Sequence, residues 1–232
     1  MTRVINYSLG KLSNFKTIHW LVLLFILSLI IRLILFFAPI ESLTTLQGDE
    51  QAYSSMAESI VNGTGWQDYA GRASYLPPLL PMKLALIYYL FNIDLNIAKL
   101  LMIILSSFVG PTIFFTSKTL FNNKFAINLT AGIAVTFYPP SIYYSNMLLT
   151  ENAASLFVPM ILISYLITSK NHSVWGAVIS GFLWGLAAQS TQNFTFVIIG
   201  LGASVIIGLI ASALITDDFD VDIFFGIRGG YE

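Results

Sequence analysis

The stretch "IHWLVLLFILSLIIRLILFFA", residues 18–38, decides the fold class of this chain. A membrane-spanning helix needs about 20 consecutive apolar residues, whereas the apolar core of a signal peptide is shorter. No convincing small-residue cleavage site follows the run, so the run predicts a retained transmembrane helix. Its one formal charge is Arg32, toward the outer end. We interpret Arg32 as a snorkelling arginine, with a ligand contact as the alternative.

The composition of the whole chain supports a membrane protein. Of its 232 residues, 56% are hydrophobic and 10% are charged, which is more apolar surface than a soluble domain of this length can bury. The net charge of −1 provides no basic surface, so no nucleic-acid partner is expected. The absence of cysteine excludes thiolate metal sites, and two histidines do not predict a histidine-based metal cluster.

Further apolar runs predict an all-α polytopic bundle of about six transmembrane helices. The additional predicted spans are 97–117, 125–141, 153–168, 174–191 and 195–215. We expect a transmembrane domain over 1–215, with a first outer loop over 39–96, and an acidic cytoplasmic tail over 216–232. The spacing of Gly181 and Gly185 is consistent with close helix packing.

One apolar stretch, 77–91, is not expected to cross the membrane. Lys83 lies in its middle, and an unpaired lysine at the bilayer centre costs about 2.5–3.5 kcal/mol on insertion scales. Three prolines also crowd its start. We therefore predict that this stretch lies at the membrane interface, with the Lys83 stem along apolar surface and the amine in water.

The basic residues predict the orientation of the six spans. The side that holds both termini carries Arg3, Lys11, Lys16, Lys118, Lys124, Lys170 and Arg228. The opposite side carries Arg72, Lys83 and Lys99. Because lysine and arginine accumulate in cytoplasmic loops, the chain is predicted to be an integral plasma-membrane protein with both termini in the cytoplasm.

The long outer loop contains a pair of adjacent acids, Asp49 and Glu50, in a chain where charge is scarce. The pair begins a predicted amphipathic helix over 49–61, which Asn62-Gly63 would end. A structural interpretation is that Asp49 caps the helix and Glu50 complements its dipole. The alternative is that a carboxylate held at a rigid helix end serves as a base or metal ligand.

Other charged residues of the predicted outer side admit two interpretations each. Glu151 is a second acid at the start of a span, where Thr150-Glu151 also suits a cap and first turn. Arg72 and Lys83 lie near aromatic residues and are able to bind a phosphate at the membrane surface. The alternative for both cations is contact with lipid headgroups inside an interfacial aromatic belt.

Several stretches occur in an order that resembles a known family. After the first helix come Gly-Asp-Glu and an amphipathic helix, followed by "YLPPLLP" (75–81), "KTLFNNK" (118–124), "YPPSIYYSNMLLTE" (138–151) and "GLAAQSTQ" (185–192). Over about residues 18–200 the chain resembles the N-terminal half of the GT-C membrane glycosyltransferases. It is similar to the protein mannosyltransferase-like group that includes aminoarabinose and galacturonic acid transferases.

The resemblance implies a chemistry for the outer loop. Such enzymes transfer a sugar, with inversion, from a polyprenyl-phosphate carrier to a lipid, glycan or protein acceptor on the outer membrane face. It implies that Asp49 acts as the catalytic base or helps to organise the site, supported by Glu50. It also implies that Glu151 is a second acid or a ligand of a divalent metal. Arg72 or Lys83 would hold the carrier phosphate, whose developing charge needs a cation.

Two rival functions remain open at this stage. Members of the family are longer and have more spans, so an alternative is a catalytically inactive half-enzyme that acts as a membrane scaffold or needs a second subunit for the missing helices. A lipid flippase or transporter ranks last, because transporters place ionisable or unwound sites near the midplane. Apart from Lys99 at the start of a span, Arg32 is the one formal charge inside a predicted span.

Overall fold

The computed structural model describes residues 17–73, 76–121, 124–171, 174–191 and 199. Every regular element in these ranges is a helix, which confirms the all-α class, and the pairing of Gln67 with Ala73 is an isolated bridge. The helices are α2 (Thr17–Phe36), α3 (Glu41–Thr44), α4 (Asp49–Val61), α5 (Leu79–Phe91), α6 (Leu95–Ser106), α7 (Val109–Leu120), α8 (Phe125–Thr136), α9 (Pro139–Tyr144), α10 (Glu151–Asn171) and α11 (Val174–Ser190).

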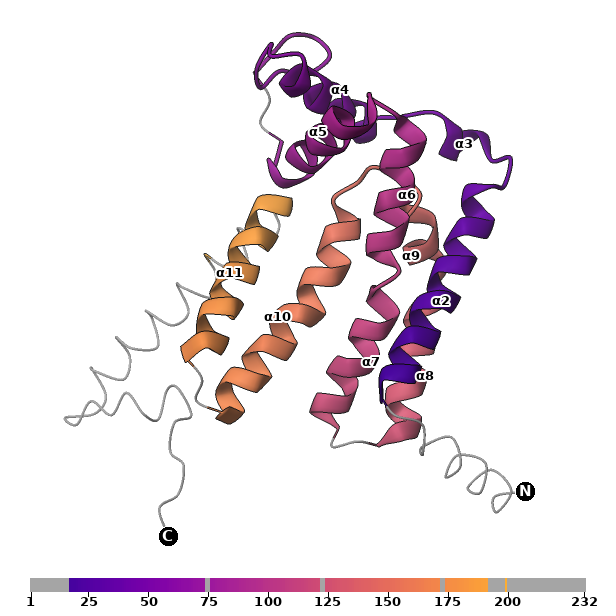
Figure 1. The fold of residues 1–232 in the computed structure, drawn as a ribbon, viewed down its shortest axis with the longest axis vertical. Coiled ribbons are helices and arrows are strands. Elements are labelled where there is room, and N and C mark those ends of the chain that lie inside the picture. Colours follow the sequence, from indigo (N-terminus) through magenta and orange to yellow (C-terminus); the bar gives the residue numbers. More distant parts are fainter. Residues whose placement is uncertain (1–16, 74–75, 122–123, 172–173, 192–198, 200–232) are drawn as a thin grey trace, which may run out of the picture.

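The longer helices form a bundle that α4 and α5 cover at one end (Figure 1). Following the colours of Figure 1, α2 runs toward that end, α6 and α7 run away from it, and the chain then returns through α8 and α9. α10 runs away again and α11 returns. α5 lies at the end of the bundle (Figure 1), and the interfacial location of 77–91 stays a prediction.

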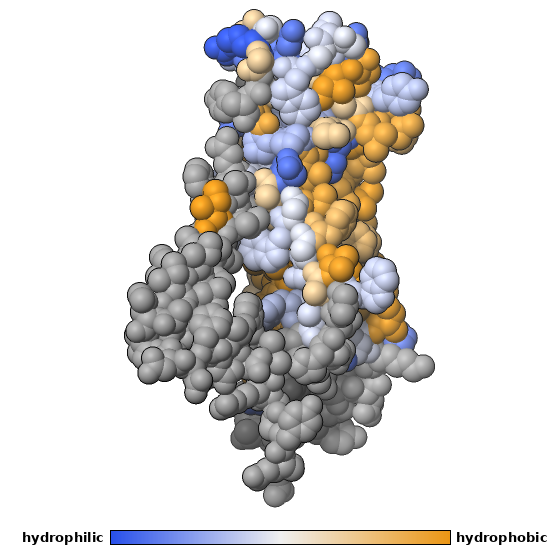
Figure 2. Space-filling model, turned by 90° about the vertical axis from the view of Figure 1, so that its left-hand side faces the viewer, coloured by the Kyte–Doolittle hydropathy of each residue, from blue (hydrophilic) through white to orange (hydrophobic). Residues whose placement is uncertain are grey.

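Within the part of the chain that the structure describes, three segments are long and apolar enough to cross a membrane. They are Thr17–Phe36, Leu95–Leu120 and Glu151–Thr168. Figure 2 shows hydrophobic side chains along the side of the bundle and hydrophilic ones gathered at the end that carries α4 and α5. The predicted span 195–215 and the predicted tail 216–232 lie outside the described residues.

The predicted single span over 97–117 is interrupted. α6 ends at Ser106 and α7 begins at Val109, with Ser107 and Phe108 between them. Pro111 has no backbone N–H, so the Ser107 carbonyl cannot receive the helical hydrogen bond from four residues ahead. Together α6 and α7 nevertheless form a segment of 26 residues, Leu95–Leu120, that is long and apolar enough to cross a membrane.

The prediction of one continuous helix over 125–141 is wrong. α8 ends at Thr136, and Tyr138 adopts an extended conformation (φ −68°, ψ 112°) before the short helix α9 begins at Pro139. A residue that precedes proline is disfavoured in the helical region, which explains the break. With 12 residues, α8 is about 18 Å long, shorter than the hydrocarbon core of a bilayer.

Two described glycines allow α7 and α8 to approach closely. A Cβ added at Gly110 would overlap Thr136 Oγ1 of α8, and a Cβ added at Gly132 would lie 3.1 Å from Phe114 Cβ of α7. By contrast, no described atom lies within 4 Å of a Cβ added at Gly181 or Gly185. The expected small-residue contact is therefore found between α7 and α8 rather than at the 181–185 pair.

The end of the bundle has its own hydrophobic core. Tyr53 and Ala57 of α4 pack with Leu84 and Tyr88 of α5, and the cluster continues into Met102 of α6. Tyr88 also shares a 2.8 Å hydrogen bond between its hydroxyl and Ser54 Oγ. Burial of this apolar surface fixes α4 and α5 to the bundle, and with them the loop that carries the predicted site.

Candidate functional site

The loop helix α4 has the predicted bounds, Asp49–Val61, but the residue that precedes it as N-cap differs from the expected one. Gly48 is the N-cap, with φ +54°, and no side chain caps the helix. A positive φ favours glycine because it has no Cβ to clash with the backbone. Asp49 is the first helical residue and its side chain is exposed, so the interpretation of Asp49 as the capping residue is wrong.

Asp49 and Arg72 line the same pocket at this end of the molecule. The pocket has a volume of about 460 Å³. Its remaining lining residues come from the start of α4 and from the loop before α5: Gly48, Ala52, Asp68, Tyr69, Ala73 and Leu76. The structure thus brings together a predicted base and a predicted phosphate ligand that are 23 positions apart in the sequence.

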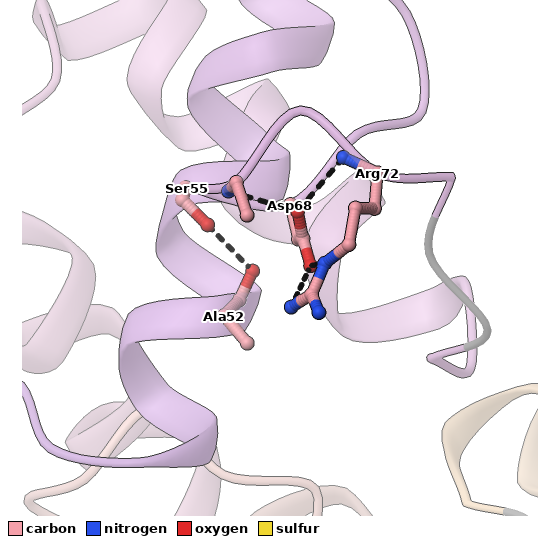
Figure 3. A network of polar contacts seen from close by, with 5 residues as sticks. Ala52, Ser55, Asp68 and Arg72 are labelled. Carbon is pink, nitrogen blue, oxygen red and sulfur yellow. Dashed lines mark hydrogen bonds and ion pairs between the residues drawn. The ribbon is translucent and has the colours of Figure 1, made fainter.

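Arg72 is anchored by Asp68 within the loop. Arg72 Nη2 lies 2.8 Å from Asp68 Oδ2, and Arg72 Nε donates to the same oxygen at 3.0 Å. Asp68 Oδ1 accepts the backbone N–H groups of Ala70 and Arg72 at 2.9 and 3.0 Å. Figure 3 shows this network beside α4, near Ala52.

These contacts shift the pKa of both partners. The backbone N–H of Arg72 holds the pKa of the Asp68 carboxyl below its usual value, and the guanidinium lowers it further. The hydrogen bond with Asp68 raises the pKa of Arg72. Since 70% of the Arg72 side chain is exposed, its remaining N–H groups are available to an anion that enters the pocket.

Glu50 occupies a different environment from its neighbour Asp49. Its side chain is fully buried, and Oε1 accepts the backbone N–H of Leu148 at 2.8 Å. Within the described residues, Oε2 has no hydrogen-bond partner. Glu50 does not line the pocket that contains Asp49. Its hydrogen bond with the Leu148 N–H positions α4 against the chain segment that precedes α10.

Lys83 does not join the pocket of Asp49 and Arg72. Its Nζ lies 3.9 Å from Met102 Sδ, between α5 and the bundle. Burial lowers the pKa of Lys83 below its usual value. The expectation of a fully hydrated amine is therefore corrected: the side chain turns toward the bundle.

Glu151 begins α10 with an exposed side chain, as the first-turn interpretation predicts. It lines a separate, mostly apolar pocket of about 430 Å³ that includes Tyr144, Asn152 and Pro159. Within the described ranges, no three histidine, cysteine, aspartate or glutamate side chains lie close enough together to hold a metal. The described carboxylates therefore do not fit a divalent metal site that joins Glu151 to Asp49.

Arg32 is not a snorkelling side chain. It is fully buried, and it donates from Nη1 to the carbonyl and hydroxyl oxygens of Ser28 and from Nη2 to Ser141 Oγ, the last at 2.9 Å. These acceptors are neutral and lie on α2 and α9. Arg32 therefore ties the first helix to the segment between α8 and α10.

Two buried polar residues near the end of the bundle that carries α4 and α5 were not among the predicted site residues. Lys99 is 3% exposed and donates from Nζ to the Leu43 carbonyl at 2.6 Å, which fastens α3 to α6. Asn146 is 1% exposed and donates from Nδ2 to the Ile142 carbonyl at 3.1 Å. The burial of Lys99 could have been predicted from the sequence, because this lysine lies inside an otherwise apolar helix, at Ala98-Lys99-Leu100.

No protein-family model matches this chain, and neither a curated protein nor a solved structure matches it. The candidate site is therefore defined by its geometry: an exposed carboxylate and an exposed guanidinium that face one pocket, at the end of a bundle whose helices include segments apolar enough to cross a membrane.

Proposed function

We propose that this chain is a membrane glycosyltransferase, or the N-terminal part of one, that uses a sugar carried on a polyprenyl phosphate. The observation that carries the proposal is the shared pocket of Asp49 and Arg72. Sugar transfer from a lipid phosphate needs a base for the acceptor hydroxyl and a cation for the leaving phosphate, close to the membrane. This pocket offers both groups.

In the proposed reaction the Asp49 carboxylate accepts the proton of an acceptor hydroxyl. The acceptor oxygen then forms a bond to the anomeric carbon of the sugar, and the bond between that carbon and the phosphate oxygen breaks with its electron pair. The carrier leaves as a polyprenyl phosphate, and attack from the opposite face inverts the anomeric centre. Arg72 stabilises the negative charge that develops on the phosphate.

The role of Arg72 requires that Asp68 and the phosphate share its guanidinium. An arginine carries five N–H donors, and Asp68 Oδ2 engages the one on Nε and one of the two on Nη2. Nη1 remains for a phosphate oxygen, while the pair with Asp68 keeps the side chain directed along the pocket wall. Asp68 is therefore a positioning residue in this proposal.

We further propose that the chain spans the plasma membrane six times, with both termini in the cytoplasm. The alternation of five described passes, α2, α6–α7, α8–α9, α10 and α11, supports this arrangement (Figure 1), and the sixth proposed span, 195–215, lies outside the described residues. It places the pocket on the side with few basic residues, which the positive-inside rule assigns to the outside.

The test is a transfer assay in native membranes with labelled polyprenyl-phosphate sugars. Asp49→Asn keeps the shape of the side chain but removes its basicity, so transfer should fall by about 100-fold or more. Arg72→Gln should reduce transfer by a similar factor, because it removes the cation. Glu151→Gln is the matched control, since that acid lies in the other pocket and transfer should persist.

A folded, inserted protein that transfers sugar from none of the donors would contradict the proposal. That outcome would favour the non-catalytic alternative, a membrane scaffold or partner subunit. Full activity of Asp49→Asn would also contradict it, because the pocket would then lack its base.

A further inference from the structure

A third pocket lies between the end of α2, α3 and the start of α6, and it shares no lining residue with the pockets of Asp49 and Glu151. Its volume is about 390 Å³, within the range of sites for small molecules. Two buried polar side chains, Lys99 and Asn146, line it together with Phe36, Phe37 and Leu100. No step of the proposed transfer uses these residues.

Lys99 supplies a cation whose hydrogen-bonding capacity is incompletely used. Its ammonium group has three N–H donors, and the described residues give it one hydrogen-bond acceptor, the Leu43 carbonyl at 2.6 Å. The buried Glu50 carboxylate attracts Lys99 without forming an ion pair with it, so donors of Lys99 remain unused. A buried ammonium with so few acceptors is costly, because the lost hydration is not replaced. An anionic ligand oxygen in the pocket would satisfy the remaining donors.

Asn146 supplies an acceptor that also lacks a partner. Its Nδ2 donates to the carbonyl of Ile142, whereas Oδ1 is buried with no donor in the described part of the chain. An unsatisfied buried acceptor costs about 1–3 kcal/mol. A ligand that also carries a hydroxyl donor matches this group, while a bare anion does not.

The walls of the pocket indicate where such a ligand comes from. Phe37 is 76% exposed at the outer end of the first membrane-crossing helix, and Phe36 and Leu100 are apolar neighbours. Exposed Thr44 and Asn96 contribute polar groups to the lining. This combination of apolar walls and polar groups, beside helices that cross the bilayer, suits a lipid headgroup with its chains in the membrane.

We propose that this pocket binds a phosphodiester that carries a free hydroxyl, in the form of the headgroup of phosphatidylglycerol. Lys99 contacts the phosphate and Asn146 Oδ1 accepts a glycerol hydroxyl. Because Lys99 also holds the Leu43 carbonyl, a bound headgroup steadies α3 against α6, next to the loop that leads into α4. This inference does not depend on the proposed transferase activity.

The test measures lipid retention by native mass spectrometry after reconstitution of the full chain in phosphatidylcholine nanodiscs. Separate samples contain a minor fraction of phosphatidylglycerol, or of phosphatidic acid, which has the phosphate without the glycerol hydroxyls. Phosphatidylglycerol should be retained most strongly. Equal retention of all three lipids would overturn the proposal, and equal retention of the two anionic lipids would overturn the hydroxyl contact.

Two variants and a control connect retention to the pocket. Lys99→Met should reduce retention of phosphatidylglycerol about tenfold, as expected for one hydrogen bond to a charged group. Leu100→Trp fills the pocket while leaving Lys99 in place, so it should reduce retention even if Lys99→Met folds poorly. Lys83→Met is the control, since that half-buried lysine lies outside the pocket. Unchanged retention in both pocket variants would overturn the proposal.

A competition arm identifies the source of the ligand. Soluble glycerol phosphate presents the same phosphate and hydroxyls without the acyl chains. If the lipid chains contribute through Phe36 and Phe37, millimolar glycerol phosphate should displace little bound phosphatidylglycerol. Complete displacement at that concentration would overturn the assignment to a membrane lipid.

Discussion

Asp49 and Glu50 are adjacent in the sequence, yet they have different roles in the structure. Asp49 is exposed and lines a pocket, whereas Glu50 is fully buried and accepts the Leu148 N–H at 2.8 Å. Consecutive residues of a helix point about 100° apart, so one can face solvent while the next faces the core. At the scale of the residue, the pair divides into a group that lines the pocket and a group that positions α4.

Glu50→Ala should lower the stability of the protein by about 1–3 kcal/mol, because it leaves the Leu148 N–H buried without an acceptor. The measurement is the thermal unfolding midpoint in detergent, combined with amide exchange at Leu148, which should become faster. Glu50→Gln keeps an acceptor oxygen for the Leu148 N–H and should lose less stability than Glu50→Ala. Wild-type stability and exchange in Glu50→Ala would show that the contact does not hold α4.

Lys83→Met should raise stability by about 1 kcal/mol at neutral pH, since it removes a partly desolvated charge. Burial lowers the pKa of Lys83 in the folded state below the unfolded value of about 10.4. Between those two pKa values the unfolded chain binds more protons, so the stability of the wild type rises with pH in that window.

Unfolding midpoints measured across the alkaline range test this sign. The wild type should gain stability as the pH rises through the folded pKa of Lys83, and the gain should be smaller in Lys83→Met. Lys124→Met, which changes an exposed lysine, serves as the control and should leave the pH dependence unchanged. If the midpoints of the wild type and of Lys83→Met have the same pH dependence in this window, the Lys83 amine is not desolvated in the folded state.

At the scale of the element, the contact between α7 and α8 depends on small residues. Gly110 faces Thr136, whose hydroxyl donates to the Gly132 carbonyl at 2.8 Å. A methyl group at either glycine would meet atoms of a neighbouring helix, because the two backbones approach closely. This contact positions α8, which is short for a spanning helix and depends on its neighbours.

Gly110→Ala should destabilise the protein by about 1–3 kcal/mol through overpacking against Thr136. Gly181→Ala is the matched control in α11, where no described atom lies within 4 Å of the added Cβ. That control should be neutral or stabilising, since alanine favours a helix by up to about 1 kcal/mol over glycine. Equal unfolding midpoints for the two variants would contradict a tight α7–α8 contact.

At the scale of the whole molecule, the orientation in the membrane decides where the pocket of Asp49 lies. The chain contains no cysteine, so single cysteines are unambiguous labels. In intact cells, Ala70→Cys should react with a membrane-impermeant maleimide, while Lys124→Cys should react only after permeabilisation. If 77–91 crossed the membrane, position 124 would be labelled in intact cells as well.

The sequence by itself determined the local features of this protein. The apolar runs determined the all-helical class, and Gly48 and Asn62-Gly63 determined the bounds of the loop helix at Asp49–Val61. Lys83 and the nearby prolines indicated that 77–91 lies at the end of the bundle. These features follow from hydrophobic periodicity and terminal residues within a few turns of helix, which neighbouring positions in the sequence specify.

Only the tertiary structure decided which polar side chains are buried and which face a pocket. Glu50 meets Leu148 across 98 positions, Lys99 meets Leu43 across 56, and Arg32 meets Ser141 across 109. Such pairings depend on how helices rotate and stack to bury their apolar surface. The neighbouring sequence of each of these charged residues was equally compatible with an exposed side chain. Long-range packing therefore determined the candidate site, because it alone placed Asp49 and Arg72 on one pocket and turned Glu50 and Lys83 away from it.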